Sequence, residues 1–209
     1  HQLKESGKDY PPQAIVGIRP CDATAFKLVR KNFDNPDYQD PWWVKRYEST
    51  TFVGLGCNAP CSTCFCASAG SGPFDTKGLD VLLHDIGDSC VAKGLTDKGE
   101  EFLKKAGGKA ADEKAVKKAE SLTRDVAKKI TSTIPTDKLG TKKATDLYDA
   151  PFWEEVAFSC INCGTCTYLC PTCWCFDIQD EVQRLDKQGD RLRNWDSCMF
   201  PLFTLHASG

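Results

Sequence analysis

Thirteen cysteines in 209 residues, most of them gathered into two short runs, constrain this chain more than any other feature. One run lies within residues 57–66 and the other within residues 160–175, while Cys21, Cys90 and Cys198 stand apart. Disulfide frameworks join cysteines spread through a secreted chain, whereas a metal centre needs several thiolates at short spacing. The odd total and the close spacing therefore indicate metal binding in a reducing compartment, and we expect a cytoplasmic protein.

The composition excludes several classes of protein. Hydrophobic residues make up 41% and charged residues 27%, close to the values of globular chains. A net charge of -2 removes the electrostatic basis for a dedicated nucleic-acid binder. The sequence contains no apolar run of about 18 residues, so no membrane span is predicted. Residues 1–5 have neither an initiator Met nor the layout of a secretory signal, and we interpret the chain as a piece of a longer protein.

Two short apolar runs in the N-terminal part of the chain predict strands. Residues 14–18 and residues 51–55 are each expected to form a buried strand that delivers a cysteine at its carboxyl end. Cys21 follows the first strand and Cys57 follows the second. A helix expected over residues 23–31 would connect them as parallel strands.

The middle of the chain predicts a hairpin followed by helices. Residues 81–86 and 90–95 flank a Gly-Asp-Ser turn that is typical of a hairpin, with Cys90 as a buried apolar thiol. A helix is expected to run from residue 96 through residue 105. Residues 103–130 carry nine basic and four acidic side chains. We interpret this segment as a solvated helical connector, and a docking face for an acidic partner is the alternative.

The C-terminal run has the spacing Cys-x2-Cys-x2-Cys-x3-Cys-Pro, at Cys160, Cys163, Cys166 and Cys170. This is the run with which bacterial ferredoxins hold 4Fe-4S clusters, and in two-cluster ferredoxins its fourth cysteine binds the other cluster. Gly164 lets the backbone turn closely beneath the sulfurs. Zinc is the competing interpretation because two knuckle-like pairs are present, but only three residues separate the pairs. We therefore expect iron-sulfur clusters here.

The N-terminal run and its neighbour supply five thiols for one centre: Cys21, Cys57, Cys61, Cys64 and Cys66. Thiolates suit both iron-sulfur clusters and zinc, so the spacing alone leaves both open. The small residues of segment 67–73 allow the backbone to approach a centre closely.

These features predict an α+β protein with three parts. We expect a mixed α/β iron-sulfur domain over residues 1–105, a helical connector over residues 106–149 and a ferredoxin-like 4Fe-4S domain over residues 150–209. The C-terminal region holds seven thiols, one short of two four-thiolate clusters. We therefore expect the missing ligand in a continuation beyond residue 209.

Several motifs together carry a resemblance to a known family. They lie at residues 17–22, 56–57, 64–66, 70–73, 151–155, 170–176 and 191–198. On these residues the chain resembles a family of cytosolic iron-sulfur electron-transfer subunits. The family includes the beta subunits of soluble sulfhydrogenases and the A subunit of anaerobic sulfite reductase.

The resemblance implies two or three 4Fe-4S clusters and their ligands. The ligands of the first cluster would be Cys21, Cys57, Cys64 and Cys66. Those of the second would include Cys160, Cys163 and Cys166, and Cys170 would bind a third. Cys61 departs from the family pattern and leaves a ligand exchange with Cys57 open. Additional ligands without assigned partners are Cys61, Cys173, Cys175 and Cys198.

The resemblance also implies a function as an electron relay without catalytic residues of its own. Such subunits lie between a flavoprotein subunit that handles NAD(P)H and a catalytic subunit of the hydrogenase, sulfite reductase or heterodisulfide reductase type. The sequence has no Gly-x-Gly-x-x-Gly after a strand, which agrees with a nucleotide and a flavin held by a partner. Trp153, Trp174 and Trp195 are expected either to form a dry shell around the clusters or to pack in an ordinary core.

Two other classes of function remain as alternatives. A cluster-based reductase would use paired adjacent thiols, and the sequence has no Cys-Cys pair. A zinc-stabilised binding module would recognise nucleic acid through the Lys-rich stretch 104–129, which lacks interleaved aromatic residues. Under the leading hypothesis, we expect no nucleic-acid partner and no membrane span.

Overall fold

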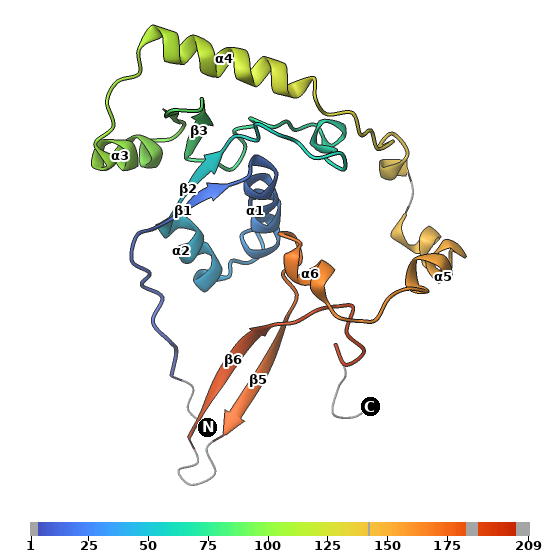
Figure 1. Cartoon of the computed structure of the whole chain (residues 1–209). Helices are drawn as coiled ribbons and strands as arrows, with labels where there is room; N and C mark the ends of the chain where they lie inside the picture. The colour runs from blue at the N-terminus through green and yellow to red at the C-terminus, as the bar shows by residue number, and fades with distance from the viewer. Residues whose placement is uncertain (1–3, 142, 183–187, 204–209) are drawn as a thin grey trace. The chain divides into compact units, whose positions relative to one another are not determined.

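The structure, a computed structural model, describes residues 4–141, 143–182 and 188–203 (Figure 1). The chain divides into two compact units, residues 1–139 and residues 140–209, which we call unit 1 and unit 2. Helices and strands occur in both units, and the expected α+β class is confirmed. The three-part domain division expected from the sequence stays a prediction.

Unit 1 is built on a four-stranded sheet. Its strands are β1 (Gln13–Ile18), β2 (Thr50–Leu55), β3 (Val81–Asp85) and β4 (Cys90–Gly94), in the order β1-β2-β3-β4. β1 pairs with β2 and β2 with β3 in parallel, whereas β3 and β4 form an antiparallel hairpin. The expected parallel pair and the expected hairpin are therefore both confirmed.

Strand β1 differs from the expectation in its burial. Residues 14–18 were expected to be buried, but five of the six residues of β1 are exposed. The reason is that β1 is the edge strand of the sheet, so that only β2 flanks it. β2 is central and is buried along five of its six residues.

Two helices connect β1 and β2. The expected helix lies within α1 (Pro20–Phe33), and a second helix, α2 (Pro41–Ser49), precedes β2. The side chain of Asp40 accepts a hydrogen bond from the Trp43 backbone N–H, and Pro41 occupies the first turn of α2. An N-cap acid followed by proline is a recognised helix start, so the sequence carried a signal for α2 that we did not use.

Asp80 joins three elements of unit 1. Its carboxylate accepts hydrogen bonds from the Phe52 backbone N–H at 2.9 Å and from the Thr96 hydroxyl at 2.7 Å. The Lys98 ammonium lies 3.1 Å from the same carboxylate. Thr96 also caps α3 (Asp97–Ala106) by accepting from the Gly99 N–H. A single buried acid therefore links β2 and the start of β3 to the helix that follows the hairpin.

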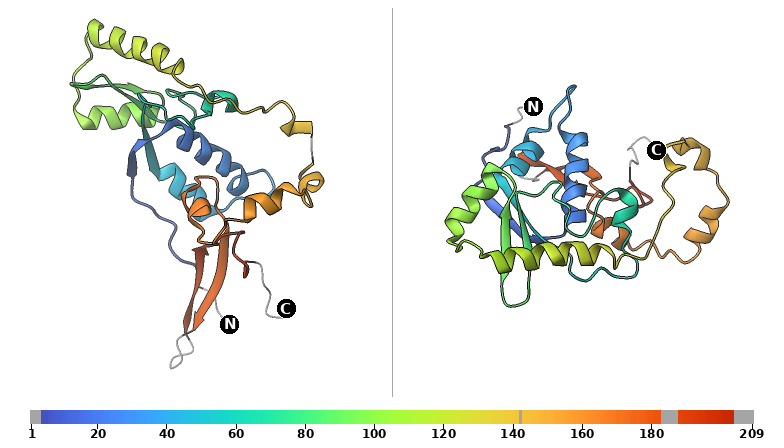
Figure 2. Two further views of the ribbon diagram at one scale, coloured as in Figure 1. Left: turned by 45° about the vertical axis from the view of Figure 1, so that its right-hand side comes forward. Right: turned by 90° about the horizontal axis from the view of Figure 1, so that it is seen from above.

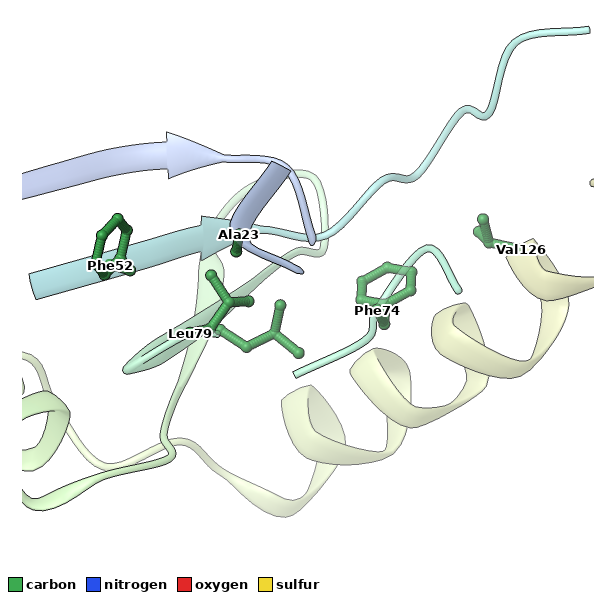
Figure 3. Packing of buried hydrophobic residues seen from close by; sticks show 6 residues of the cluster. Ala23, Phe52, Phe74, Leu79 and Val126 are labelled. Carbon is green, nitrogen blue, oxygen red and sulfur yellow. The ribbon is translucent and has the colours of Figure 1, made fainter. Parts of the chain in front are cut away.

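The core of unit 1 draws one residue from the Lys-rich segment. Its buried members, shown in Figure 3, are Ala23, Phe52, Phe74, Leu79, Leu82 and Val126. Val126 lies in α4 (Glu113–Ala127), is fully buried, and the helix lies beside β4 (Figure 2). One stripe of this mixed-charge helix is thus packed, although most of its surface is solvated.

The described residues of unit 2 form the helices α5 (Phe152–Ala157) and α6 (Thr165–Leu169) and a hairpin of the strands β5 (Phe176–Val182) and β6 (Gly189–Trp195). The described chain also contains the 3-10 helices η1 (Cys66–Ala69), η2 (Leu139–Thr141) and η3 (Ala144–Leu147). In the described part of the chain, no helix is both long and apolar enough to cross a membrane.

The packing of α4 can be tested at Val126. The Val126→Ala change removes two buried methyl groups, and we expect it to lower the free energy of unfolding by about 2 kcal/mol. Denaturant titration of the two proteins measures the difference. The matched control is Lys118→Ala on the exposed face of the same helix, which should stay within about 0.5 kcal/mol of the parent. Equal free energies of unfolding for the parent and Val126→Ala would contradict the packing of α4 and would indicate a solvated connector.

Candidate metal centres

The first group of thiols lies at the carboxyl ends of β1 and β2. Cys21 is the second residue of α1, and Cys57 comes two residues after β2. The Cys57 N–H donates to the Pro73 carbonyl at 2.9 Å, and the Arg19 guanidinium donates to the Gly56 carbonyl at 3.2 Å. These two hydrogen bonds fix the start of the loop of residues 57–66, which we call the thiol loop.

Gly56 is required at this entry by a close approach. A Cβ at this position would lie 2.0 Å from the ring of Phe74, which is part of the core. Phe74 also stacks on His84 of β3, with ring centroids 5.0 Å apart. The glycine thus lets the chain pass directly over the core before it reaches Cys57.

Cys61 and Cys64 form a tight turn in which their sulfurs meet. The two Sγ atoms lie 3.1 Å apart, the Cys61 N–H donates to Cys64 Sγ at 3.3 Å, and the Cys64 N–H donates to the Cys61 carbonyl. The hydrogen bond between the thiols lowers the pKa of Cys61 and raises the pKa of Cys64. The sequence-predicted ligand Cys64 therefore lies against the thiol that departs from the family pattern.

Cys21 follows β1 and the other thiols of this group follow β2. Burial, followed by the neighbouring Asp22 carboxylate, raises the pKa of Cys21, and Cys66 makes a smaller contribution in the same direction. Because β1 and β2 are parallel, the two segments that carry these thiols start at the same edge of the sheet. That the thiols bind one cluster stays a prediction.

A second chain segment holds the thiol loop in place, and no sequence pattern predicted this contact. The Ile134 N–H donates to the Ser68 hydroxyl at 3.0 Å, and the Thr136 hydroxyl donates to the Ser68 carbonyl at 3.4 Å. Ser68 lies in η1, which begins at Cys66. Residues 134–136, which we had placed in the connector, therefore bind the loop that carries four of the N-terminal cysteines.

The ferredoxin run of unit 2 is shaped by two left-handed residues. Asn162 has a φ of 58° and Gly164 a φ of 70°, and α6 begins directly after Gly164. The Asn162 N–H donates to Cys160 Sγ at 3.4 Å. The Thr165 hydroxyl beside Cys163 lowers the pKa of that thiol. Helix α6 ends at Leu169, so that Cys170 follows the helix directly and precedes Pro171.

The other thiols of unit 2 lie near Cys170. The Thr172 hydroxyl, 3.1 Å from Cys170 Sγ, lowers the pKa of Cys170. The thiol of Cys170 in turn raises the pKa of Cys173 to about 11. Cys160, Cys163 and Cys166 are exposed, whereas Cys170 and Cys173 are half-buried.

The chemistry of the donors fits iron-sulfur clusters. Within residues 4–141, 143–182 and 188–203, no group of three or more Cys, His, Asp or Glu side chains is arranged to hold a metal ion. The candidate donors are thiol sulfurs on loops and at the starts of short or long helices, and backbone N–H groups donate to the sulfurs of Cys64 and Cys160. Thiolates with such N–H donors are the environment of iron-sulfur clusters.

Two expectations about individual side chains were wrong. Cys90 is exposed because it begins β4, the other edge strand of the sheet. Trp153, Trp174 and Trp195 leave 47%, 36% and 42% of their surface exposed, so they form neither a dry shell nor a closed core within the described chain. The indole N–H groups of these three residues instead donate to backbone carbonyls.

Comparison with known proteins agrees with this donor set. Residues 159–209 match the sequence profile of the 4Fe-4S dicluster domain family, which supports iron-sulfur clusters as the cofactor. The chain is 30% identical over 199 residues to sulfhydrogenase 2 subunit beta of Pyrococcus furiosus, a match that covers 93% of this chain and 58% of that subunit. The resemblance stated from the cysteine motifs is thereby confirmed. No solved structure matches.

Gly164 provides a test of the geometry of the ferredoxin run. An alanine at this left-handed position would place Cβ 2.5 Å from the Phe200 ring. We expect Gly164→Ala to lower the free energy of unfolding of unit 2 by about 1–2 kcal/mol. The matched control is Gly140→Ala, where a Cβ meets open space. Thermal unfolding of both variants measures the difference, and equal losses would contradict the described turn.

Proposed function

We propose that this chain is an electron-transfer iron-sulfur subunit of a cytoplasmic oxidoreductase complex. The observation that carries the proposal is the match of residues 159–209, which contain the ferredoxin run, to the 4Fe-4S dicluster domain. The Pyrococcus relative is by its name a subunit of a sulfhydrogenase, which supports partner subunits for this chain. The match spans 58% of the length of that relative.

The partners follow from the chemistry of a relay. We infer a flavoprotein subunit that exchanges electrons with NAD(P)H on one side and a catalytic redox subunit on the other. The catalytic subunit would be of the hydrogenase, sulfite reductase or heterodisulfide reductase type. The chain itself would contribute no catalytic residue, no nucleic-acid contact and no membrane span to the complex.

The proposed ligands divide between the two units. In unit 1, Cys21, Cys57, Cys64 and Cys66 would hold one 4Fe-4S cluster. In unit 2, Cys160, Cys163 and Cys166 would hold a second, and Cys170 would bind a third. Bound clusters supply reversible one-electron chemistry.

The residues around these thiols would tune and protect the clusters. The N–H groups of Cys61 and Asn162 donate to proposed ligand sulfurs, which stabilises their negative charge and favours the reduced state. The close approach at Gly56 and the anchor at Ser68 hold the loop in position, so that little of it needs to move when an electron arrives. A relay with a rigid ligand loop loses little driving force to reorganisation.

Metal and sulfide analysis tests the proposal. The full-length protein, purified without oxygen, should contain iron and acid-labile sulfide in equal amounts, at about eight or more of each. The reduced protein should show the EPR signals of 4Fe-4S clusters. About one or two zinc ions with negligible sulfide would contradict the relay and indicate the zinc-stabilised binding module.

One substitution tests the N-terminal centre. Cys57→Ser removes a proposed ligand, and we expect the loss of about four iron and four sulfide per chain. Cys90→Ser is the matched control, because Cys90 is an exposed thiol outside both groups. Equal iron contents in the two variants would contradict the assignment of Cys57.

A further inference from the structure

Cys61 and Cys64 are separated by two residues and follow a unit of two parallel strands joined by helices. The unit consists of β1, α1, α2 and β2, and the thiol loop that carries both cysteines begins after β2. A Cys-x2-Cys pair near such a unit has the spacing of a redox-active dithiol. Cys61 is not among the ligands proposed for the N-terminal cluster, so its thiol has no role in the proposed function.

The backbone of this pair has the geometry that a disulfide needs. The Cys64 N–H donates to the Cys61 carbonyl at 3.0 Å, which closes a four-residue turn. In such a turn the first and fourth Cα atoms lie within about 7 Å of each other, which overlaps the range that disulfides span. The two Sγ atoms lie 3.1 Å apart. Because a disulfide bond is about 2.05 Å long, the sulfurs need to approach by only about 1 Å.

Neighbouring groups hold the two sulfurs against each other. The Cys61 N–H donates to Cys64 Sγ at 3.3 Å, and the Thr63 hydroxyl lies 3.7 Å from Cys61 Sγ. The thiol loop is fixed at its start by the hydrogen bond from Cys57, and it continues into η1, where Ser68 is bound by the Ile134 N–H. The pair is therefore ordered before any bond forms, so little further conformational entropy is lost when the sulfurs join.

The two thiols differ in their access to solvent. Cys61 is exposed, as are the two residues between the cysteines, whereas Cys64 is half-buried. Exchange between a thiol and a disulfide depends on access to the attacking sulfur. An external disulfide therefore reaches Cys61 first, and Cys64 lies in position to complete the exchange from within the loop.

We propose that Cys61 and Cys64 form a reversible disulfide that competes with the N-terminal cluster for Cys64. This inference rests on the proposed function, in which Cys64 is a ligand of that cluster. The Cys61 thiolate attacks one sulfur of a small-molecule disulfide, which gives a mixed disulfide and releases one thiol. The Cys64 thiolate then attacks the Cys61 sulfur, which closes the internal bond and releases the second thiol. The two protein thiols lose two electrons and two protons, and the external disulfide takes up both.

The first test uses the full-length parent protein, purified without oxygen, and needs no variant. The protein is incubated with glutathione disulfide and with bathophenanthroline, a ferrous chelator that prevents released iron from returning. Free thiols are then alkylated with iodoacetamide in denaturant, and the peptides are sequenced by mass spectrometry. We expect a bond between Cys61 and Cys64, opened again by dithiothreitol, and the loss of about four iron and four sulfide per chain. Free thiols at both positions after this treatment would overturn the proposal.

The second test determines whether the loss of iron requires the disulfide. Cys61→Ser cannot form the bond but keeps the proposed ligands, so it should start with the iron content of the parent and retain it in glutathione disulfide. Cys90→Ser is the matched control, because Cys90 is an exposed thiol outside the loop, and it should lose iron as the parent does. Equal losses from the parent and Cys61→Ser would overturn the proposal, as would a Cys61→Ser protein that lacks this iron from the start.

The two proposals fail in different ways. A protein without acid-labile sulfide would contradict the electron relay, and a reversible bond between Cys61 and Cys64 in that protein would still support the dithiol site. Iron and sulfide that stay bound in glutathione disulfide, with both thiols free after denaturation, would support the relay and overturn the disulfide.

Discussion

The parallel pairing of β1 with β2 is the constraint on which the N-terminal centre depends. Parallel strands end at the same edge of a sheet, so the segments that follow them start side by side. Here those segments carry Cys21 and Cys57. The register shifts between Val16 and Ile18, at a glycine with a φ of 89°, just before the chain turns into α1. Without this pairing, neighbouring thiols would have to come from the loop 57–66 alone.

The rest of unit 1 makes that sheet edge rigid while leaving the thiol loop irregular. Asp80 ties β2 to the start of α3, and Val126 covers the core from α4. The loop contains the short helix η1, and its irregular backbone suits the cluster proposed for it. An irregular loop that is anchored on a rigid sheet can hold its ligand side chains in accurate positions.

Local patterns predicted much of this fold, and long-range contacts account for what was missed. The parallel strands and the hairpin at residues 81–95 follow from short sequence patterns, and the structure confirms them. The contact of Ile134 with Ser68 and the burial of Val126 depend on segments far apart in the chain, which no local pattern encodes. For the same reason the sequence named Cys198 as an additional ligand without indicating which thiols it would meet. The exposed β1 shows that an apolar run alone does not distinguish an edge strand from a central one.

The bond between Ile134 and Ser68 also sets the length of the tether between the two thiol-bearing units. The chain is fastened to the N-terminal thiol loop at Ile134 and Thr136, so its free path to the ferredoxin run starts after Thr136 and not at the end of α4. A shorter tether raises the effective concentration of one unit around the other. The attachment therefore shortens the stretch of chain that links the two proposed cluster sites.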